Sequence, residues 1–283
     1  MRVIGIGDNV VDRYINKRIM FPGGNAVNFA AYAKQCGVDS AYLGLIADDK
    51  EGRLVYESLK ELGIDVSESP LRKGLATERC DVVLEEGDRV FQGCSYGEGT
   101  YKTLTLTEEN LKYLEQFDLV HCGCYACMED EIVKLKELPA IRTYDFSSEE
   151  EYRTDEYLEK VCPYIDIALF SAEEMDKKQA ESLREKVIKL GTKLVVITNG
   201  TKGQILWDGQ TEYPGIVKLV EPVDTMGAGD SFFTAFVLAL AEEGYNREKP
   251  VTGEMIEQAF SRAAEFSAKT CLVEGAFGFG TEY

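Results

Sequence analysis

The sequence is poor in basic residues. Among its 283 residues, 31 are Lys or Arg and 50 are Asp or Glu, which gives a formal net charge of −19. Nucleic acids and anionic membrane surfaces both require a basic protein face, so this composition excludes them as partners. An anionic ligand must instead be held by local devices, namely helix N-termini, a few Lys or Arg side chains, and a metal ion.

Long apolar runs are also missing. The longest, Phe232 to Ala241, is about half of the roughly 20 residues that a membrane-spanning helix needs. The first residues, MRVIGIGDNV, start directly in a strand pattern and lack the features of a signal peptide. We therefore expect a soluble, cytoplasmic protein with no membrane partner.

Histidine occurs once, at His121, in the segment HCGCYAC that also holds Cys122, Cys124 and Cys127. As a metal site these residues would match neither a CxxC pair nor a zinc-finger repeat, although a Cys/His metal protein remains an alternative. The pattern is more typical of a buried strand that runs into its loop, with cysteine serving as a small apolar residue. Without a secretory signal, we expect the cysteines to be reduced thiols.

The chain contains no linker, low-complexity segment or internal repeat, so we predict one domain over residues 1–283. Apolar strand-like runs lie at residues 2–7, 40–47, 117–123, 140–146, 165–170 and 193–198. Helical patterns lie between them, at Asn25–Cys36, Lys50–Leu62, Glu108–Phe117 and Glu173–Leu190. This alternation predicts an α/β fold with a mainly parallel central sheet flanked by helices.

The alternation breaks in two places. Val10–Ile19 and Leu75–Gln92 have strand-like patterns with no helix between neighbouring strands, and VVLEEGDRVFQG predicts a hairpin that turns at residues 86–88. We expect a small antiparallel β lid beside the main sheet, with strands near residues 10–20 and 75–92. Lids of this kind close over substrates.

The segment DTMGAGDSFF, residues 224–233, precedes an apolar helix expected from about Asp230 to Glu242. Small residues at 227–229 leave backbone N–H groups approachable at a helix N-terminus, which attracts anions. Asp224 or Thr225 could cap this helix, so Asp230 is not needed as a cap. We interpret Asp230 as a carboxylate base beside an oxyanion or phosphate cradle, kept ionised by the helix dipole.

Ligands of open α/β sheets bind outside the carboxyl ends of the strands, so residues in the loops there are candidates for the functional site. FPGGNAVNFAAY places Gly23–Gly24 in a turn before a helix, with Asn25 at the helix start and Asn28 one turn later. This pattern is either a glycine turn with an Asn N-cap or, together with Asp12, a grip for vicinal hydroxyl groups.

Two further loops are candidates for phosphate binding. ITNGTKG, residues 197–203, either offers backbone amides and the Lys202 ammonium to phosphates or forms only a hairpin with the strand after it. The Walker pattern GxxxxGK[ST] is absent, which excludes a P-loop enzyme. SAEE, residues 171–174, is either an acidic helix start or a segment in which Glu174 organises a magnesium ion through water.

Together these loops resemble the PfkB (ribokinase-like) family of carbohydrate kinases. GGNAVNFAAYAKQCG and DTMGAGDSFFTAFVLAL match the two family signatures, and the resemblance runs through the whole chain. It implies a ribokinase-like fold and an ATP-dependent transfer of a phosphoryl group to a sugar hydroxyl, with Mg²⁺. The roles that it implies for catalysis are the base at Asp230 and an anion hole at Gly227, Ala228 and Gly229.

The same resemblance implies ligand-binding roles. Sugar binding would fall to Asp12, Gly24, Asn25 and Asn28, and ATP binding to Thr198, Gly200, Gly203 and Glu174. The family usually has a four-residue motif that begins with Asn and ends with Glu. This chain has Ser171 at the first of these positions and Glu174 at the last. A monovalent cation, K⁺, would bind near Asp224 and the neighbourhood of Gly275.

Within the family, GDNVVDRY and GDRVFQG resemble the subgroup that phosphorylates fructoselysine. The expected substrate is therefore a ketosamine (an Amadori compound) such as fructoselysine, phosphorylated on its 6-hydroxyl. Arg89 and Glu98 are candidates for binding its amino-acid end, or else solvated charges on a hairpin. A homodimer through the lid is a further expectation. Fructokinase-like or ribokinase-like kinases and a non-catalytic sugar- or nucleotide-binding regulator are the alternatives.

Overall fold

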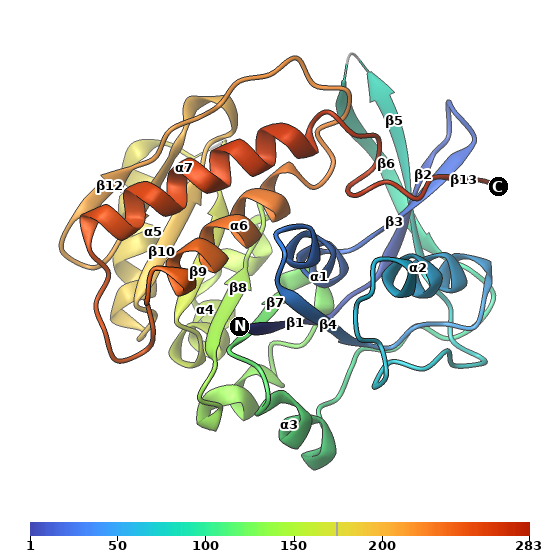
Figure 1. The fold of residues 1–283 in the computed structure, drawn as a ribbon, viewed down its shortest axis with the longest axis horizontal. Coiled ribbons are helices and arrows are strands. Elements are labelled where there is room, and N and C mark those ends of the chain that lie inside the picture. The colour runs from blue at the N-terminus through green and yellow to red at the C-terminus, as the bar shows by residue number, and fades with distance from the viewer. Residues whose placement is uncertain (86, 174) are drawn as a thin grey trace.

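The computed structural model describes residues 1–85, 87–173 and 175–283. Its larger sheet has the strand order β12-β11-β10-β9-β8-β7-β1-β4 (Figure 1). The strands from β4 to β10 in this order run parallel, and β11 and β12 are antiparallel additions at one edge. The predicted mainly parallel sheet is confirmed. Its strands are β1 (Arg2–Gly7), β4 (Asp39–Gly44), β7 (Leu119–Gly123), β8 (Ile141–Asp145), β9 (Ile167–Ser171), β10 (Leu194–Thr198), β11 (Gln204–Trp207) and β12 (Glu212–Pro214).

Helices cover both faces of this sheet (Figure 1). One face carries α1 (Asn25–Gln35), α6 (Ala228–Glu242) and α7 (Gly253–Thr270), and the other carries α3 (Glu108–Leu114), α4 (Asp155–Val161) and α5 (Lys177–Lys189). Neighbouring residues of β1 enter different cores: Val3 packs in a cluster with Phe236, and Ile4 in a cluster with Leu158. Strands buried on both faces read as continuous apolar runs, which is why the sequence signals them well.

The smaller sheet forms the lid, with the order β13-β3-β2-β5-β6. Its strands are β2 (Val10–Tyr14), β3 (Ile19–Gly23), β5 (Glu78–Glu85), β6 (Asp88–Tyr96) and β13 (Thr281–Glu282), and α2 (Lys50–Glu61) packs against β2 and β3. The prediction of one strand over Val10–Ile19 is wrong, because a turn divides it into β2 and the antiparallel β3. The lid is also mixed rather than antiparallel. The chain crosses through β4 and α2 before it returns, so β5 pairs with β2 in parallel.

Several predicted boundaries are also corrected. The helix expected over Glu173–Leu190 begins at Lys177, where Asp176 forms a capping box with Gln179. The helix expected from about Asp230 begins at Ala228, and the helix expected over Glu108–Phe117 ends at Leu114. Short 3-10 helices lie at Cys124–Ala126, Ile132–Glu137, Glu150–Arg153, Cys162–Tyr164 and Gly200–Lys202. Among the described residues, no helix combines the length and apolarity needed to cross a bilayer.

The expectation of reduced thiols fails at one pair of cysteines. Cys80 on β5 and Cys94 on β6 stand directly opposite each other and form a disulfide with a Cα–Cα distance of 4.1 Å. The antiparallel register of the hairpin brings the two together, and this register is invisible in the spacing of the cysteines. The free cysteines are Cys36, Cys122, Cys124, Cys127, Cys162 and Cys271.

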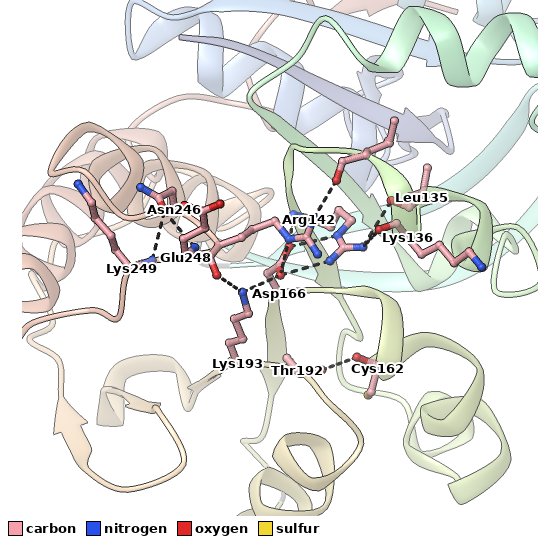
Figure 2. Close-up of polar contacts among 12 residues, drawn as sticks. Leu135, Lys136, Arg142, Cys162, Asp166, Thr192, Lys193, Asn246, Glu248 and Lys249 are labelled. Carbon is pink, nitrogen blue, oxygen red and sulfur yellow. Dashed lines mark hydrogen bonds and ion pairs between the residues drawn. The ribbon is translucent and has the colours of Figure 1, made fainter.

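A buried ionic cluster closes the amino ends of β8, β9 and β10. Asp166, 1% exposed, precedes β9 and is surrounded by cations from three other segments (Figure 2). Its carboxylate lies 3.1 Å from Arg142 Nε, 3.2 Å from Arg247 Nε and 3.6 Å from Lys193 Nζ. The Arg142 and Arg247 guanidinium groups also donate to backbone carbonyls, so the polar groups of this cluster satisfy one another.

Candidate active site

Polar side chains from distant parts of the chain meet at the other end of the sheet, where the carboxyl ends of β1, β7 and β8 face the first turns of α1 and α6. Asn25 Nδ2 lies 2.9 Å from Asp145 Oδ2 and 2.9 Å from Asp230 Oδ1, and Asn28 Nδ2 lies 2.6 Å from Asp230 Oδ2. The glycine-rich segment and the DTMGAGD segment therefore form one site. The prediction that these loops converge agrees with this geometry.

Asp230 occupies the first turn of α6 and accepts hydrogen bonds from two amides. Burial raises the pKa of Asp230, and the hydrogen bonds from Asn28 and Asn25 and the charge of Arg89 oppose this rise. The expectation that the helix dipole keeps Asp230 ionised stays a prediction. A raised pKa brings a carboxylate closer to the range in which it works well as a general base near neutral pH.

The N-terminus of α6 is shaped by glycine. Gly227 is the N-cap, with φ of +73°, and a Cβ there would lie 2.1 Å from Tyr32 Oη. Only glycine fits both the conformation and the close approach. The Ala228 N–H donates to the Thr225 carbonyl. Within the described part of the chain, the amides of Gly227 and Gly229 have no partner, so these are the donors left for an anion.

Asp224 does not cap α6, contrary to one expectation. Its buried carboxylate accepts from Tyr14 Oη at 2.6 Å, from the Gly275 N–H at 2.8 Å and from the Met226 N–H at 2.9 Å. Tyr14 belongs to the lid and Gly275 to the segment after α7. Asp224 therefore links both to the loop before α6.

Two of the sugar-binding candidates carry buried polar side chains. Asp12, on β2, is 4% exposed, and burial raises its pKa to about 7, opposed by Arg89 and reinforced by Asp224 and Asp230. Asn28 Oδ1 is buried and has no hydrogen-bond partner among the residues that the structure describes. An acceptor of this kind fits a hydroxyl donor from a ligand.

Gly24 lets the start of α1 lie close to the residues after β1. Its φ is +108°, and a Cβ there would lie 2.9 Å from both Asn9 Cα and Asp8 Oδ2. Gly24, rather than Asn25, is the N-cap of α1, and the Asp8 carboxylate accepts from the Asn25 N–H at 2.6 Å and the Ala26 N–H at 3.2 Å. Burial raises the pKa of Asp8 to about 6.

Asp145 is a site residue that the sequence interpretation missed. It ends β8, accepts from Asn25 Nδ2, and has a pKa raised to about 7 by burial and by the charge of Asp230. The signal was present, because Asp145 follows a buried apolar run as Asp8 does. The sequence does not reveal which of several strand-end acids faces the crevice, since that depends on strand order.

The ATP-binding candidates lie further along the same sheet edge, at the ends of β9 and β10. Thr198 Oγ1 is 3.2 Å from Ser171 Oγ, and Gly200 and Gly203 begin and follow the short helix after β10. Both glycines have positive φ, of 50° and 114°. Glu174 lies outside the described residues. Of the described candidates, Thr198, Gly200 and Gly203 have no hydrogen bond to Asp230, and β9 and β10 follow β8 in the sheet.

Arg89 extends from lid strand β6 toward the catalytic group. Its Nη1 donates to the Thr225 carbonyl and Oγ1, both at 3.0 Å. Its charge lowers the pKa of Asp12 and of Asp230, which places it on the catalytic side of the lid. Glu98, the other residue considered for the amino-acid end of the substrate, is exposed beyond β6.

The HCGCYAC segment does not assemble a metal cluster in the described residues, where the one group with suitable ligand spacing is Glu78, Cys80 and Cys94. His121 instead uses both ring nitrogens, with Nε2 at 2.8 Å from Asn25 Oδ1 and Nδ1 at 2.9 Å from Thr143 Oγ1. The segment is the buried strand β7 and the loop after it, as the alternative interpretation predicts.

A ribokinase-like α/β sheet with a buried carboxylate at a glycine-capped helix N-terminus is typical of sugar kinases, phosphotransferases that act on an alcohol group. Residues 8–279 match the pfkB family carbohydrate kinases, and the chain belongs to this family. It is 34% identical to the fructosamine kinase FrlD of Bacillus subtilis over 100% of this chain and 95% of that protein. It is 32% identical to the fructoselysine 6-kinase of Escherichia coli over 96% of this chain and 98% of that protein.

Solved structures support the same fold. A fructokinase with bound ATP from Xylella fastidiosa superposes with a TM-score of 0.79 at 16% identity, covering 98% of this chain and 94% of that one. At this identity the likeness concerns the fold alone.

Proposed function

We propose that this kinase transfers the γ-phosphoryl group of ATP to the 6-hydroxyl of a ketosamine, with fructoselysine as the first candidate. The observation that carries the proposal is the similarity, over nearly the full length, to two proteins named for fructosamine and fructoselysine. Fructokinase-like and ribokinase-like substrates remain the alternatives within the family, and kinetics separates them.

A pocket beside the sugar site supports an amine-bearing substrate. It is lined by Asp8, Glu78 and Lys102, among others. Burial raises the pKa of Glu78, while Lys102 is exposed at the rim. Fructoselysine carries a secondary amine next to its sugar and a carboxylate at its far end. The carboxylates of Asp8 and Glu78 suit the amine, and the Lys102 ammonium suits the carboxylate.

In the proposed mechanism, Asp230 accepts the proton of the 6-hydroxyl as that oxygen attacks the γ-phosphorus. The amides of Gly227 and Gly229 stabilise charge on the transferred phosphoryl oxygens, each worth about 3 kcal/mol when well aligned. Asp12 and Asn28 orient the sugar, since they provide an unpaired carboxylate and an unpaired amide oxygen. Phosphoryl transfer depends mainly on such alignment and charge stabilisation.

Thr198, Gly200 and Gly203 would bind ATP in this proposal, and Mg²⁺ would arrive with its phosphates. Mg²⁺ in kinases is held mainly by substrate phosphates and one or two carboxylates, which suits a site whose described residues form no closed set of acidic ligands there. A K⁺ ion near Asp224 stays a prediction, since the three hydrogen bonds that this carboxylate accepts leave one of its roughly four acceptor sites. We assign K⁺ no step.

The test compares kcat/KM for fructoselysine, fructose and ribose under saturating Mg·ATP. A higher value for fructose or ribose would reject the ketosamine assignment while leaving the sugar kinase intact. Glu78→Gln should lower kcat/KM for fructoselysine about tenfold and leave that for fructose unchanged, because fructose has no amine. Glu98→Gln, the same change of charge on an exposed lid residue, is the matched control and should change neither.

We also propose that the lid mediates a homodimer. Its outer strand β6 is a sheet edge and exposes Val90 and Phe91, at 41% and 52%. Unpaired edges with apolar side chains favour pairing with another chain. Analytical ultracentrifugation of the wild type and of Phe91→Glu tests this, and a monomeric wild type at micromolar concentration would reject it.

A further inference from the structure

The single histidine of the chain lies one hydrogen bond away from the catalytic group. His121, on β7, is 2% exposed and stacks on Phe29 with ring centroids 4.5 Å apart, while Phe233 meets it edge-on at 5.7 Å. Burial lowers the pKa of His121 to about 3. The ring is therefore neutral near pH 7, and it takes no part in the proton transfer described above.

The hydrogen bonds around this ring have a defined direction when Asp230 is ionised. Asn25 turns its Nδ2 toward Asp230, because an ionised carboxylate can only accept, and the same NH₂ group reaches Asp145. The Asn25 oxygen then faces His121, and an amide oxygen also only accepts, so His121 carries its proton on Nε2. In a neutral ring Nδ1 is then an acceptor, and the Thr143 hydroxyl donates to it. Donation runs in one direction from Thr143 through His121 and Asn25 to the two carboxylates.

We propose that His121, oriented by Thr143, is a positioning residue that holds the Asn25 amide with its NH₂ group toward Asp230 and so sets the geometry and proton affinity of the catalytic base. Without the Nε2–H donor, the Asn25 side chain has no partner for its oxygen on the His121 side. A rotated amide would present that oxygen to two carboxylates, an arrangement that only a protonated carboxyl group tolerates. The proton affinity of the pair would therefore rise.

Few other groups can replace this donor. The titratable and charged groups that face the Asp230 carboxylate are Asp8 at the end of β1, Asp12 on β2, Tyr32 on α1, Arg89 on β6 and Asp145 on β8. Three of them are acids, which raise its proton affinity further. Asn28 is the one other side chain in the described residues that donates a hydrogen bond to Asp230. The orientation of Asn25 should thus be visible in the pH dependence of catalysis.

Three variants separate positioning from packing. His121→Phe keeps an aromatic ring for the Phe29 stack but has no N–H. His121→Gln can place its amide nitrogen near the position of Nε2 and restore the donor to Asn25. His121→Asn reaches only the Nδ1 position, beside Thr143, and serves as the matched amide control. Activity is followed with fructoselysine and, separately, with fructose, so that the outcome does not depend on which acceptor is preferred.

For His121→Phe we expect a kcat about 10- to 100-fold lower, an unchanged KM for ATP, and an acid limb of the kcat/KM profile displaced to higher pH. His121→Gln should recover kcat to within about threefold of the wild type and return the acid limb, whereas His121→Asn should not. A His121→Phe profile that keeps its acid limb while only the melting temperature falls would overturn the proposal. So would a folded His121→Gln that performs no better than His121→Phe.

A second measurement needs no variant. Because the chain has one histidine, ¹⁵N-histidine labelling gives the NMR signals of one imidazole ring. We expect a neutral ring protonated at Nε2 that does not titrate between pH 5 and 8. A ring protonated at Nδ1, or one that titrates near pH 6.5, would reverse the direction of the hydrogen bonds and overturn the proposal even if His121→Phe fails to fold.

Discussion

Buried carboxylates at the two ends of the central sheet differ in the positive charge that surrounds them. At the amino ends of the strands, Asp166 is enclosed by Arg142, Lys193 and Arg247 (Figure 2). At the carboxyl ends, burial raises the pKa values of four acids, and the charge of Arg89 opposes this rise at Asp12 and Asp230; the four acids are Asp8, Asp12, Asp145 and Asp230. Residue type and burial are similar at the two ends, so the difference lies in the counter-charge.

This difference shows which end is complete without a ligand. The Asp166 cluster satisfies its own charges and hydrogen bonds, so it links β8, β9 and the loop after α6. At the other end the acids have raised pKa values, and Asn28 Oδ1 has no hydrogen-bond partner within the described part of the chain. In the proposed function, substrates would supply the missing charges and hydroxyl groups. Perturbed pKa values of this kind gather at functional sites.

The largest effect on turnover is expected at the ligand-dependent end. Asp230→Asn should preserve the fold and ATP binding and lower kcat by about 10²- to 10⁴-fold, the usual worth of a general base. Steady-state kinetics gives kcat, and calorimetry with a non-hydrolysable ATP analogue confirms that the nucleotide still binds. A variant that kept more than a tenth of the wild-type kcat would remove Asp230 from this role.

The largest effect on stability is expected at the self-contained end. Asp166→Asn leaves the buried Arg142 guanidinium without its counter-charge, which typically costs about 3–5 kcal/mol of unfolding free energy. Urea unfolding at pH 7 measures this, and kcat of the folded fraction should stay within about twofold of the wild type. If Asp166→Asn changed kcat instead of stability, the contrast between the two ends would be wrong.

A more moderate effect is expected for sugar binding. Asp12→Ala removes an acceptor for a substrate hydroxyl, and hydrogen bonds to charged groups contribute about 1.5–3 kcal/mol, so Kd for the sugar should rise about tenfold or more. Isothermal titration calorimetry with the sugar and with the ATP analogue separates the two sites, and only the first should weaken. An unchanged sugar affinity would mean that the pocket is misplaced.

The smallest effect concerns the pH dependence of stability. Asp145 has a pKa raised from 3.8 to about 7, so the folded protein binds a proton that the unfolded chain has already released between these values. Its stabilising contribution is fully present below the lower pKa and is lost as pH rises through about 7. Asp145→Asn mimics the protonated form, so its melting temperature relative to the wild type should increase from pH 5 to pH 8. The exposed Glu98→Gln should give the same difference at both pH values, and a flat response of Asp145→Asn would contradict the raised pKa.

The amino-acid sequence by itself determined the elements whose signals are local. Continuous apolar runs mark strands buried on both faces, and the glycines of DTMGAGD mark a helix start, where a Cβ at Gly227 would collide with Tyr32. The family, the α/β class and the candidates Asp12, Asn25, Asn28 and Asp230 follow from such short segments. Each of these depends on residues that are close together in the chain.

Only the tertiary structure decided which distant residues meet. Asp145 lies 120 positions from Asn25, and His121 lies 96 positions from it, yet both contact its side chain. The parallel pairing of β2 with β5, the opposition of Cys80 and Cys94, and the cations around Asp166 likewise depend on strand order and register. Sequence patterns report the burial and the periodicity of one segment, whereas pairing between segments is set by the packing of the whole chain. That packing also decides which buried acids have neighbouring cations and which do not.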